Sequence, residues 1–320
     1  MTLRIVSLEE HHLEEAAHLV ATRHREERQH LPVLPGRFED PDQLLSPLQR
    51  LAGQSVGVVA LEGDRMVGFL LGMVLPEFKG MRTIYVPEWS HAAVGDRRRR
   101  VYEEMYAEAA ARWAADDFLL HLITTLAHDR APFAAFHWLS FGLLVVDAVR
   151  GLTPVEGAWP EVDVWRAGLE EIDTAVAFDR ALSGYLAEAP TFLLGSEPMD
   201  RAEHLAWLED PERALWVAST GGEPVAVIGL QPSNPTSAAT PQGEGTVCIT
   251  RAFTFPSARG QDIGTALLAR AIEWARSAGY VRCAVDFESA NVLGRRFWLR
   301  HFEPVCTSFM RVIDPGHSQE

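Results

Sequence analysis

The sequence contains only three cysteines, Cys248, Cys283 and Cys306, and all three lie in its second half. Their number is odd and no two have the C-x-x-C spacing, which argues against a disulfide framework and against a zinc site. A reducing cytoplasmic compartment is therefore the location that we expect for this protein.

Long apolar runs and excess positive charge are also missing. No apolar run approaches the roughly 18 residues that cross a bilayer, and the first residues (MTLRIVSLEEHH) contain no apolar signal core. The 29 Lys and Arg residues are outnumbered by 44 Asp and Glu residues, which gives a net charge of -15. An acidic surface disfavours nucleic acid and anionic membranes as partners and is compatible with an amine-bearing substrate. We expect neither a nucleic-acid nor a membrane partner.

Several motifs of known chemistry are absent as well. The chain has no GxSxG, no P-loop lysine and no GxGxxG. The N-terminal segment is rich in histidine but lacks the HExxH pattern of a zinc site. We interpret it as a solvated helix and expect no metal cofactor. Its histidines are His11, His12, His18, His24 and His30.

The two halves of the chain repeat one order of predicted elements. A chain of 320 residues suits two domains of about 150 residues each. Each half has a strand, helical segments, a β-hairpin, a long helix, a strand, a short helix and a last strand. This pattern predicts α/β domains whose mixed, mostly antiparallel twisted sheets are flanked by helices. We predict domains at residues 1–151 and 162–314, a linker at 152–161 and a tail at 315–320.

In the first half we expect a helix at Glu9–Arg28, a break at Leu31–Pro41 and a hairpin of Ser55–Leu61 with Met66–Leu75. In the second half, the elements of interest begin with a strand at Thr246–Phe255. We then expect a helix at Ile263–Ala278, a strand at Val281–Phe287 and a helix at Val292–Arg300.

A glycine-containing turn (PSARGQDIGT) joins the predicted strand Thr246–Phe255 to the predicted helix that begins at Ile263. Such a turn lets backbone N–H groups face a ligand, and the helix N-terminus adds about half a positive charge. The segment therefore predicts an anion site that suits a diphosphate, to which Arg259 can add a charge-assisted contact. A plain helix-capping turn is the alternative.

This turn resembles the Arg/Gln-x-x-Gly-x-Gly/Ala pyrophosphate loop of the GNAT acetyltransferase superfamily. Arg259 falls on its first position and Gly264 on its last, whereas Asp262 stands where the family usually has glycine. A second segment is similar to the family's Asn-x-x-Ala-x-x-Phe-Tyr helix, which lies along the pantetheine. Asn291, Gly294 and Phe297 fall on that pattern, but Trp298 replaces the tyrosine that usually acts as general acid.

The resemblance implies two acyltransferase folds in tandem, the second of which binds acetyl-CoA or another acyl-CoA as co-substrate. In the first half, the equivalent loop (Gly95–Tyr102) has no glycine where the backbone must approach phosphate, so we expect that half to be degenerate. The residues that the resemblance places against the cofactor are Ala252, Phe253, Thr254, Arg259, Gly260, Gln261, Asp262, Ile263, Gly264, Thr265, Asn291, Phe297 and Trp298.

Transfer of an acyl group to an amine needs a base, because an unperturbed ammonium has a pKa of about 10. The candidates for the base, or for an anionic seat for the amine, are Glu244, Asp286 and Glu288, each of which can instead be a surface or structural acid. The spacing of Asp286 and Glu288 directs both side chains to one face of a strand.

We therefore predict an N-acyltransferase that acts on an amine of a small molecule or peptide, as a monomer or a homodimer. Two other functions stay open: a non-catalytic module that binds acyl-CoA or another ligand, which Asp262 and Trp298 favour, and transfer to a hydroxyl group.

Overall fold

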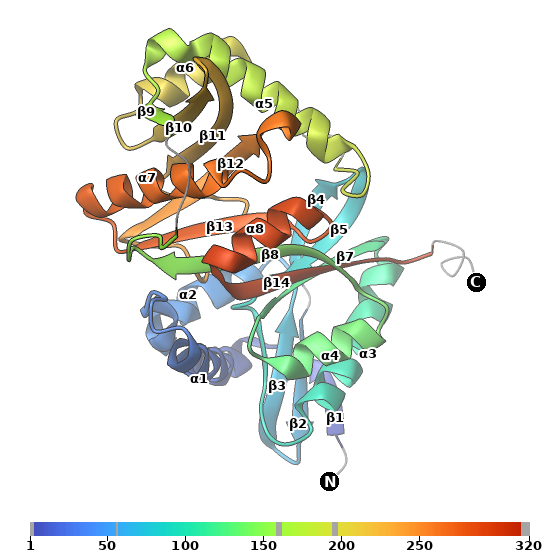
Figure 1. Cartoon of the computed structure of the whole chain (residues 1–320). Coiled ribbons are helices and arrows are strands. Elements are labelled where there is room, and N and C mark those ends of the chain that lie inside the picture. Colours follow the sequence, from blue (N-terminus) through green and yellow to red (C-terminus); the bar gives the residue numbers. More distant parts are fainter. Residues whose placement is uncertain (1–2, 56, 158–161, 194–197, 315–320) are drawn as a thin grey trace. The chain divides into compact units, whose positions relative to one another are not determined.

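The structure is a computed structural model that describes residues 3–55, 57–157, 162–193 and 198–314. The chain divides into two compact units (Figure 1). Unit 1 comprises Met1–Val146, Ala238–Thr240 and Pro304–Glu320, and unit 2 comprises Asp147–Ser237 and Pro241–Glu303. Residues 158–161 of the expected linker and the expected tail at 315–320 lie outside the described residues.

Unit 1 is a sheet structure with helices on both faces. Helices α1 and α2 pack on one face of β2 and β3, and α3 packs on the other. Its elements are β1 (Leu3–Ser7), α1 (Leu13–His30), α2 (Pro41–Ala52), β2 (Gly57–Glu62), β3 (Arg65–Leu71), β4 (Met73–Phe78), β5 (Met81–Val86), β6 (His91–Ala93), α3 (Arg98–Ala115), β7 (Leu120–Leu126), α4 (Arg130–Trp138), the first part of β8 (Gly142–Gly151) and nearly all of β14 (Glu303–Val312).

Two local predictions for the first half were wrong. The predicted strand Met66–Leu75 is two strands, β3 and β4, which pair with different partners. The helix α2 was missed, although Asp40 caps it by accepting a hydrogen bond from the Asp42 N–H at 3.0 Å and Pro41 occupies its first turn. Both residues favour a helix start, but they stand at the end of the segment that we interpret as a break.

The last strand of the chain completes unit 1. β14 pairs antiparallel with β7 from Cys306 opposite Leu126 to Val312 opposite Leu120. β7 in turn pairs parallel with β5, from Thr83 opposite Leu120 to Val86 opposite Ile123. The predicted C-terminal domain at 162–314 includes this strand, whereas its contacts place Pro304–Glu320 in unit 1.

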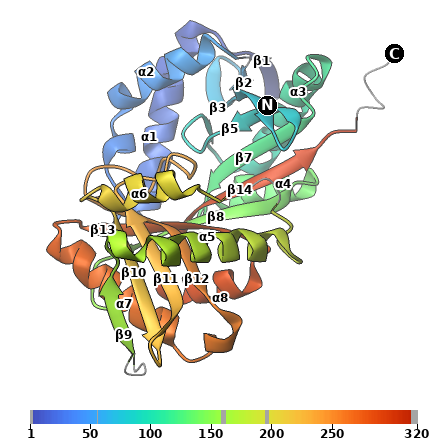
Figure 2. The same ribbon diagram turned by 90° about the horizontal axis from the view of Figure 1, so that it is seen from above.

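Unit 2 contains a sheet with the order β13-β12-β11-β10-β9, with β8 beside β13. The β12–β13 pair is parallel, and the other pairs from β9 to β12 are antiparallel. Helix α5 crosses β11 and β12 on one face, and α7 packs on the other (Figure 2). Its elements are β9 (Asp163–Arg166), α5 (Ile172–Ala187), α6 (Arg201–Glu209), β10 (Ala214–Thr220), β11 (Glu223–Gln231), β12 (Thr246–Thr254), α7 (Ile263–Ser277), β13 (Arg282–Glu288) and α8 (Val292–His301).

The predicted fold class is confirmed: each unit has a mixed, mostly antiparallel sheet that is flanked by helices. Aromatic side chains on α5, α6 and β12 form the core beneath α5, among them Phe178, Trp207 and Phe253. In the part of the chain that the structure describes, no helix has both the length and the apolar character that a bilayer crossing requires.

Candidate active site

Strand β12 separates from β13 halfway along its length. The parallel pairing of the two strands extends from Thr246 opposite Arg282 to Ile249 opposite Val285. On the other side, the pairing of β11 with β12 skips Thr250, which is the arrangement of a β-bulge. Because a bulge bends the strand that carries it, the segment Arg251–Thr254 lies along an opening in the sheet.

A cleft of about 330 Å³ lies at this opening. Its walls come from the end of β12 and the adjacent part of β11, the loop that leads into α7 with the first turns of that helix, one face of α8, and two side chains of α5, Leu182 and Tyr185. Every cofactor residue predicted from the sequence lines the cleft except Gln261, which is exposed and donates a hydrogen bond from its amide to the Ser257 carbonyl oxygen at 3.0 Å.

The first turn of α7 presents backbone donors to the cleft. A helix leaves its first N–H groups without intrahelical acceptors, and no side chain caps α7. Asp262 precedes the helix with φ of 57°, a left-handed conformation that glycine adopts without strain. Its side chain is exposed. The aspartate that stands in place of the family's usual glycine therefore introduces backbone strain at position 262, but it leaves the N–H groups of the first turn in place.

Arg259 lies along the wall of the cleft. Its Nε donates to the Thr254 carbonyl oxygen at 2.9 Å, and its guanidinium is 4.7 Å from the ring centroid of Tyr185 and 5.5 Å from that of Phe253. The two rings therefore hold a cation beside the loop, where a diphosphate would bind.

The N-terminus of α8 is capped by Asn291. Its Oδ1 accepts hydrogen bonds from the Gly294 N–H and from the Tyr185 hydroxyl, both at 3.0 Å. A Cβ atom at position 294 would lie 2.7 Å from Asn291 Nδ2, so glycine gives this side chain the room to fold back over the helix. The sequence analysis missed Tyr185, because it stands alone near the end of a predicted helix with no motif around it.

Trp298 is buried in the cleft wall. Its ring packs edge-on against Phe297, with centroids 4.8 Å apart, and against Phe302, with centroids 5.5 Å apart. An indole N–H donates hydrogen bonds but does not release its proton at neutral pH, so Trp298 cannot act as a general acid.

None of the three candidate carboxylates lines the cleft. Asp286, on β13, accepts a hydrogen bond from Asn234 Nδ2 at 2.6 Å. Burial raises the pKa of the Asp286 carboxyl above its usual range, although the Asn234 hydrogen bond opposes this. Glu288 is half-buried at the end of the same strand, and Glu244 is exposed in the loop before β12. A raised pKa of this kind is typical of a general base.

Cys248 lies in the same region as Asp286 and is not a nucleophile. Burial raises the pKa of its thiol to about 12, even though Sγ donates to Gln242 Oε1 at 3.2 Å. Since the thiolate is the reactive form of cysteine, this side chain is inert at neutral pH. Among the residues that the structure describes, no group of three or more His, Cys, Asp and Glu side chains is arranged to hold a metal ion.

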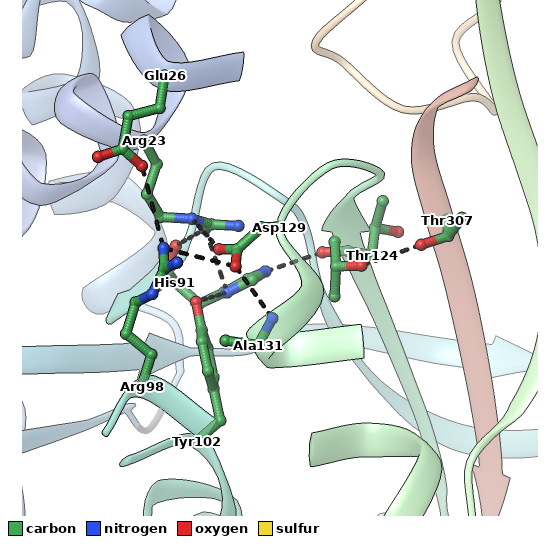
Figure 3. Close-up of polar contacts among 10 residues, drawn as sticks. Arg23, Glu26, His91, Arg98, Tyr102, Thr124, Asp129, Ala131 and Thr307 are labelled. Atoms are coloured by element: carbon green, nitrogen blue, oxygen red, sulfur yellow. Dashed lines mark hydrogen bonds and ion pairs between the residues drawn. The ribbon is translucent and has the colours of Figure 1, made fainter. Parts of the chain in front are cut away.

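The corresponding opening in unit 1 is crossed by side chains. After its parallel pairing with β7, β5 ends at Val86, and the chain continues as β6, which pairs with β3 instead. His91 on β6 spans the gap, because its Nε2 donates to the Thr124 carbonyl oxygen of β7 at 2.8 Å (Figure 3). Its Nδ1 is 3.1 Å from the Tyr102 hydroxyl.

A buried ion pair supports this bridge. Arg23 on α1 donates from Nε to Asp129 Oδ2 at 3.1 Å and from Nη1 to the His91 carbonyl oxygen at 2.6 Å (Figure 3). Arg23, His91 and Tyr102 are each no more than 3% exposed. The space that forms a cleft in unit 2 therefore contains a buried polar network in unit 1.

Two residues of the arginine run at the start of α3 pair with acids of their own helix. Arg99 contacts Glu103 at 2.7 Å and Arg100 contacts Glu104 at 2.6 Å, both at the i,i+4 spacing. Such pairs are typical of a solvated helix face.

Comparison with known proteins gives the class of the protein, a GNAT fold that occurs twice in tandem. Residues 181–302 match the family model described as the acetyltransferase (GNAT) family, so this part of the chain is a GNAT domain. A comparison with curated proteins gave no match.

Solved structures with TM-scores above 0.5 share the fold over nearly the whole chain. A GCN5-related N-acetyltransferase from Sphaerobacter thermophilus is 16% identical with a TM-score of 0.57, and the match covers 98% of this chain and 96% of that one. A GCN5-related glucosamine N-acetyltransferase region of a fungal multi-domain GH3 beta-N-acetylglucosaminidase is 13% identical with a TM-score of 0.53; the match covers 97% of this chain and 38% of that one. A tandem GNAT protein from the clavulanic acid biosynthesis pathway is 16% identical with a TM-score of 0.48, and the match covers 98% and 100% of the two chains.

Proposed function

We propose that this protein transfers an acyl group from acetyl-CoA, or from another acyl-CoA, to an amine of a small molecule or peptide, and that the active site is in the C-terminal half. The observation that carries the proposal is the cleft of about 330 Å³ between β12 and α8, at which the uncapped first turn of α7 and the guanidinium of Arg259 meet. A cytoplasmic location, and the choice between monomer and homodimer, stay predictions from the sequence.

Different residues bind the cofactor and take up the proton of the acceptor in this proposal. The N–H groups at Ile263 and Gly264 bind the diphosphate, and the segment Ala252–Thr254 binds the pantetheine and polarises the thioester carbonyl. Asp286 takes the proton of the acceptor amine or seats it as an ammonium ion. Its raised pKa brings it closer to the operating pH that general-base catalysis favours.

A second function is favoured by one observation. The cleft has a buried tryptophan, Trp298, where a proton donor for the departing thiolate is expected. A protein with this cleft and without such a donor could bind acyl-CoA as a sensor without transferring the acyl group.

Thermal unfolding with and without acetyl-CoA tests the cofactor site. Ligand at a hundred times its Kd stabilises the state that binds it by about 2.7 kcal/mol. We expect a clear rise in Tm for the wild type and none for Gly264→Glu, because a Cβ at position 264 already lies 3.4 Å from Phe297 and a carboxylate would face the diphosphate. Gly184→Glu is the matched control, since a Cβ at this exposed position has no neighbour within 4 Å.

Release of free CoA thiol with a panel of amines and alcohols then separates the functions. Turnover with an amine supports the proposal, and turnover with alcohols alone would replace it with O-acyl transfer. A Tm shift without any turnover would leave the binding module as the function. Absence of a shift at millimolar acetyl-CoA would end both acyl-CoA proposals.

A further inference from the structure

Tyr185 connects the two walls of the cleft in unit 2. It belongs to α5, which contributes neither of the two segments predicted to bind the cofactor. Its hydroxyl donates to Asn291 Oδ1 at the N-terminus of α8, 3.0 Å away. Its ring carries the guanidinium of Arg259, from the loop after β12, at 4.7 Å. One side chain thus contacts a residue from each wall.

The Gly294 N–H and the Tyr185 hydroxyl together hold the Asn291 amide. The N–H can only donate and therefore decides which end of the amide is the oxygen, and the Tyr185 hydroxyl donates to the same oxygen and restrains the side chain. A side-chain amide oxygen has two lone pairs, and those of Asn291 accept from the Gly294 N–H and the Tyr185 hydroxyl. The NH2 group must therefore occupy the other end of the amide. Asn291 lines the cleft, and no acceptor for its Nδ2 group is found among the described residues.

An amide donor held in this way matches one part of acyl-CoA. The diphosphate and the phosphorylated adenosine carry negative charge and suit Arg259 and the first turn of α7. The pantetheine arm is neutral and carries two amide carbonyl oxygens, which are hydrogen-bond acceptors. A neutral NH2 group at the N-terminus of α8 is complementary to such an oxygen.

We propose that Tyr185 is a positioning residue for acyl-CoA: it holds Asn291 so that the Nδ2 group donates to an amide carbonyl oxygen of the pantetheine arm. This inference rests on the proposed function, because it assumes that the cleft binds acyl-CoA. The alternative role for Tyr185 is packing alone, since its ring also meets that of Phe253 edge-on at 6.0 Å.

Calorimetric titration with two ligands tests the inference. Acetyl-CoA carries the pantetheine arm, and adenosine 3′,5′-bisphosphate carries the nucleotide part without it. Tyr185→Phe keeps the ring under Arg259 and removes the hydroxyl. Asn291→Asp keeps an acceptor for the Gly294 N–H and removes the donor.

We expect Tyr185→Phe and Asn291→Asp each to weaken acetyl-CoA binding by about tenfold, the value of one hydrogen bond, and to leave bisphosphate binding unchanged. Because both changes remove the same contact, the double variant should bind acetyl-CoA no more weakly than Asn291→Asp alone. The bisphosphate also controls for the negative charge that Asn291→Asp introduces, because repulsion by that charge would be seen with both ligands, whereas loss of the donor is seen with acetyl-CoA alone.

Three results would overturn the inference. Unchanged acetyl-CoA binding by Tyr185→Phe would show that the hydroxyl positions nothing. An equal loss for both ligands together with a lower Tm would show that Tyr185 acts through packing. Absence of acetyl-CoA binding by the wild type would remove the proposed function and this inference with it, whereas binding by the wild type with no effect of Tyr185→Phe would remove this inference alone.

Discussion

His91 donates its Nε2 proton to the Thr124 carbonyl oxygen at 2.8 Å, and this bond links β6 to β7 beyond the point where the pairing of β5 with β7 ends. The donor role of Nε2 leaves Nδ1 as the acceptor for the Tyr102 hydroxyl. The imidazole is thus neutral, and both of its nitrogen atoms take part in hydrogen bonds. The equivalent divergence of β12 from β13 in unit 2 has no such bridge among the described residues and forms a cleft.

The buried imidazole makes the stability of unit 1 sensitive to acid. Burial, aided by the charge of Arg23, lowers the pKa of His91 from 6.5 to about 3. The His91 imidazole therefore takes up a proton near pH 6.5 in the unfolded chain but only near pH 3 in the folded chain. Stability that is present above pH 6.5 is lost as the pH falls through this interval.

We expect urea unfolding of the wild type and of His91→Gln to reveal this difference. The free energy of unfolding should favour the wild type at pH 7, and its advantage should shrink steadily toward pH 4. Glutamine can donate to the same carbonyl oxygen and does not titrate, which makes it the suitable reference. A gap that stayed constant over this range would mean that His91 does not titrate on unfolding.

Phe309 tests whether the last strand of the chain supports the first half. It lies on β14, is 2% exposed, and packs in the core of unit 1 with Phe133 edge-on at 5.2 Å. Phe309→Ala should lower the free energy of unfolding of unit 1 by about 3–5 kcal/mol. Val312→Ala, at an exposed position of the same strand, should cost far less. Urea unfolding measures both.

The same variant separates the two units. The Tm shift that acetyl-CoA causes should persist in Phe309→Ala, because the cleft belongs to unit 2. Loss of the shift together with an intact unit 1 would mean that β14 serves the C-terminal half, as the predicted domain at 162–314 implies.

Asp286→Asn tests the proposed base. Asparagine keeps an oxygen for the Asn234 donor and loses the ability to accept a proton. We expect kcat/KM for the acceptor amine to fall by about 100-fold, within the range of general-base catalysis. The loss of rate that the wild type shows as Asp286 becomes protonated at low pH should disappear from the pH profile. Glu244→Gln and Glu288→Gln serve as controls, and a similar fall in either would reassign the base.

Trp298→Tyr tests whether proton delivery to the thiolate is slow. A phenol can donate its proton where an indole cannot. We expect kcat to rise by about tenfold, a modest share of what general acids contribute, with little change in KM for acetyl-CoA. Trp274→Tyr, on α7 and outside the residues that line the cleft, is the matched control. An unchanged kcat would mean that the leaving sulfur lies elsewhere in the cleft.

The sequence by itself determined the local parts of the site. A glycine turn, a helix start and an Asn-capped helix depend on neighbouring residues, so the pattern alone predicted that Gly264, Asn291 and the residues around them face one cleft. The repeated order of strands and helices likewise determined the fold class, because apolar periodicity is a local signal.

Contacts between distant segments were decided only by the tertiary structure. The apolar pattern of β14 fits any neighbouring strand, and its pairing with β7 depends on how both halves fold. His91 and Tyr185 have no motif, and each acquires its role from a partner 33 or 106 residues away. Gln261 is the opposite case. It lies inside the predicted loop, but its amide donates to the Ser257 carbonyl oxygen and the residue does not line the cleft. Local sequence sets backbone geometry, whereas long-range packing decides which side chains meet across it.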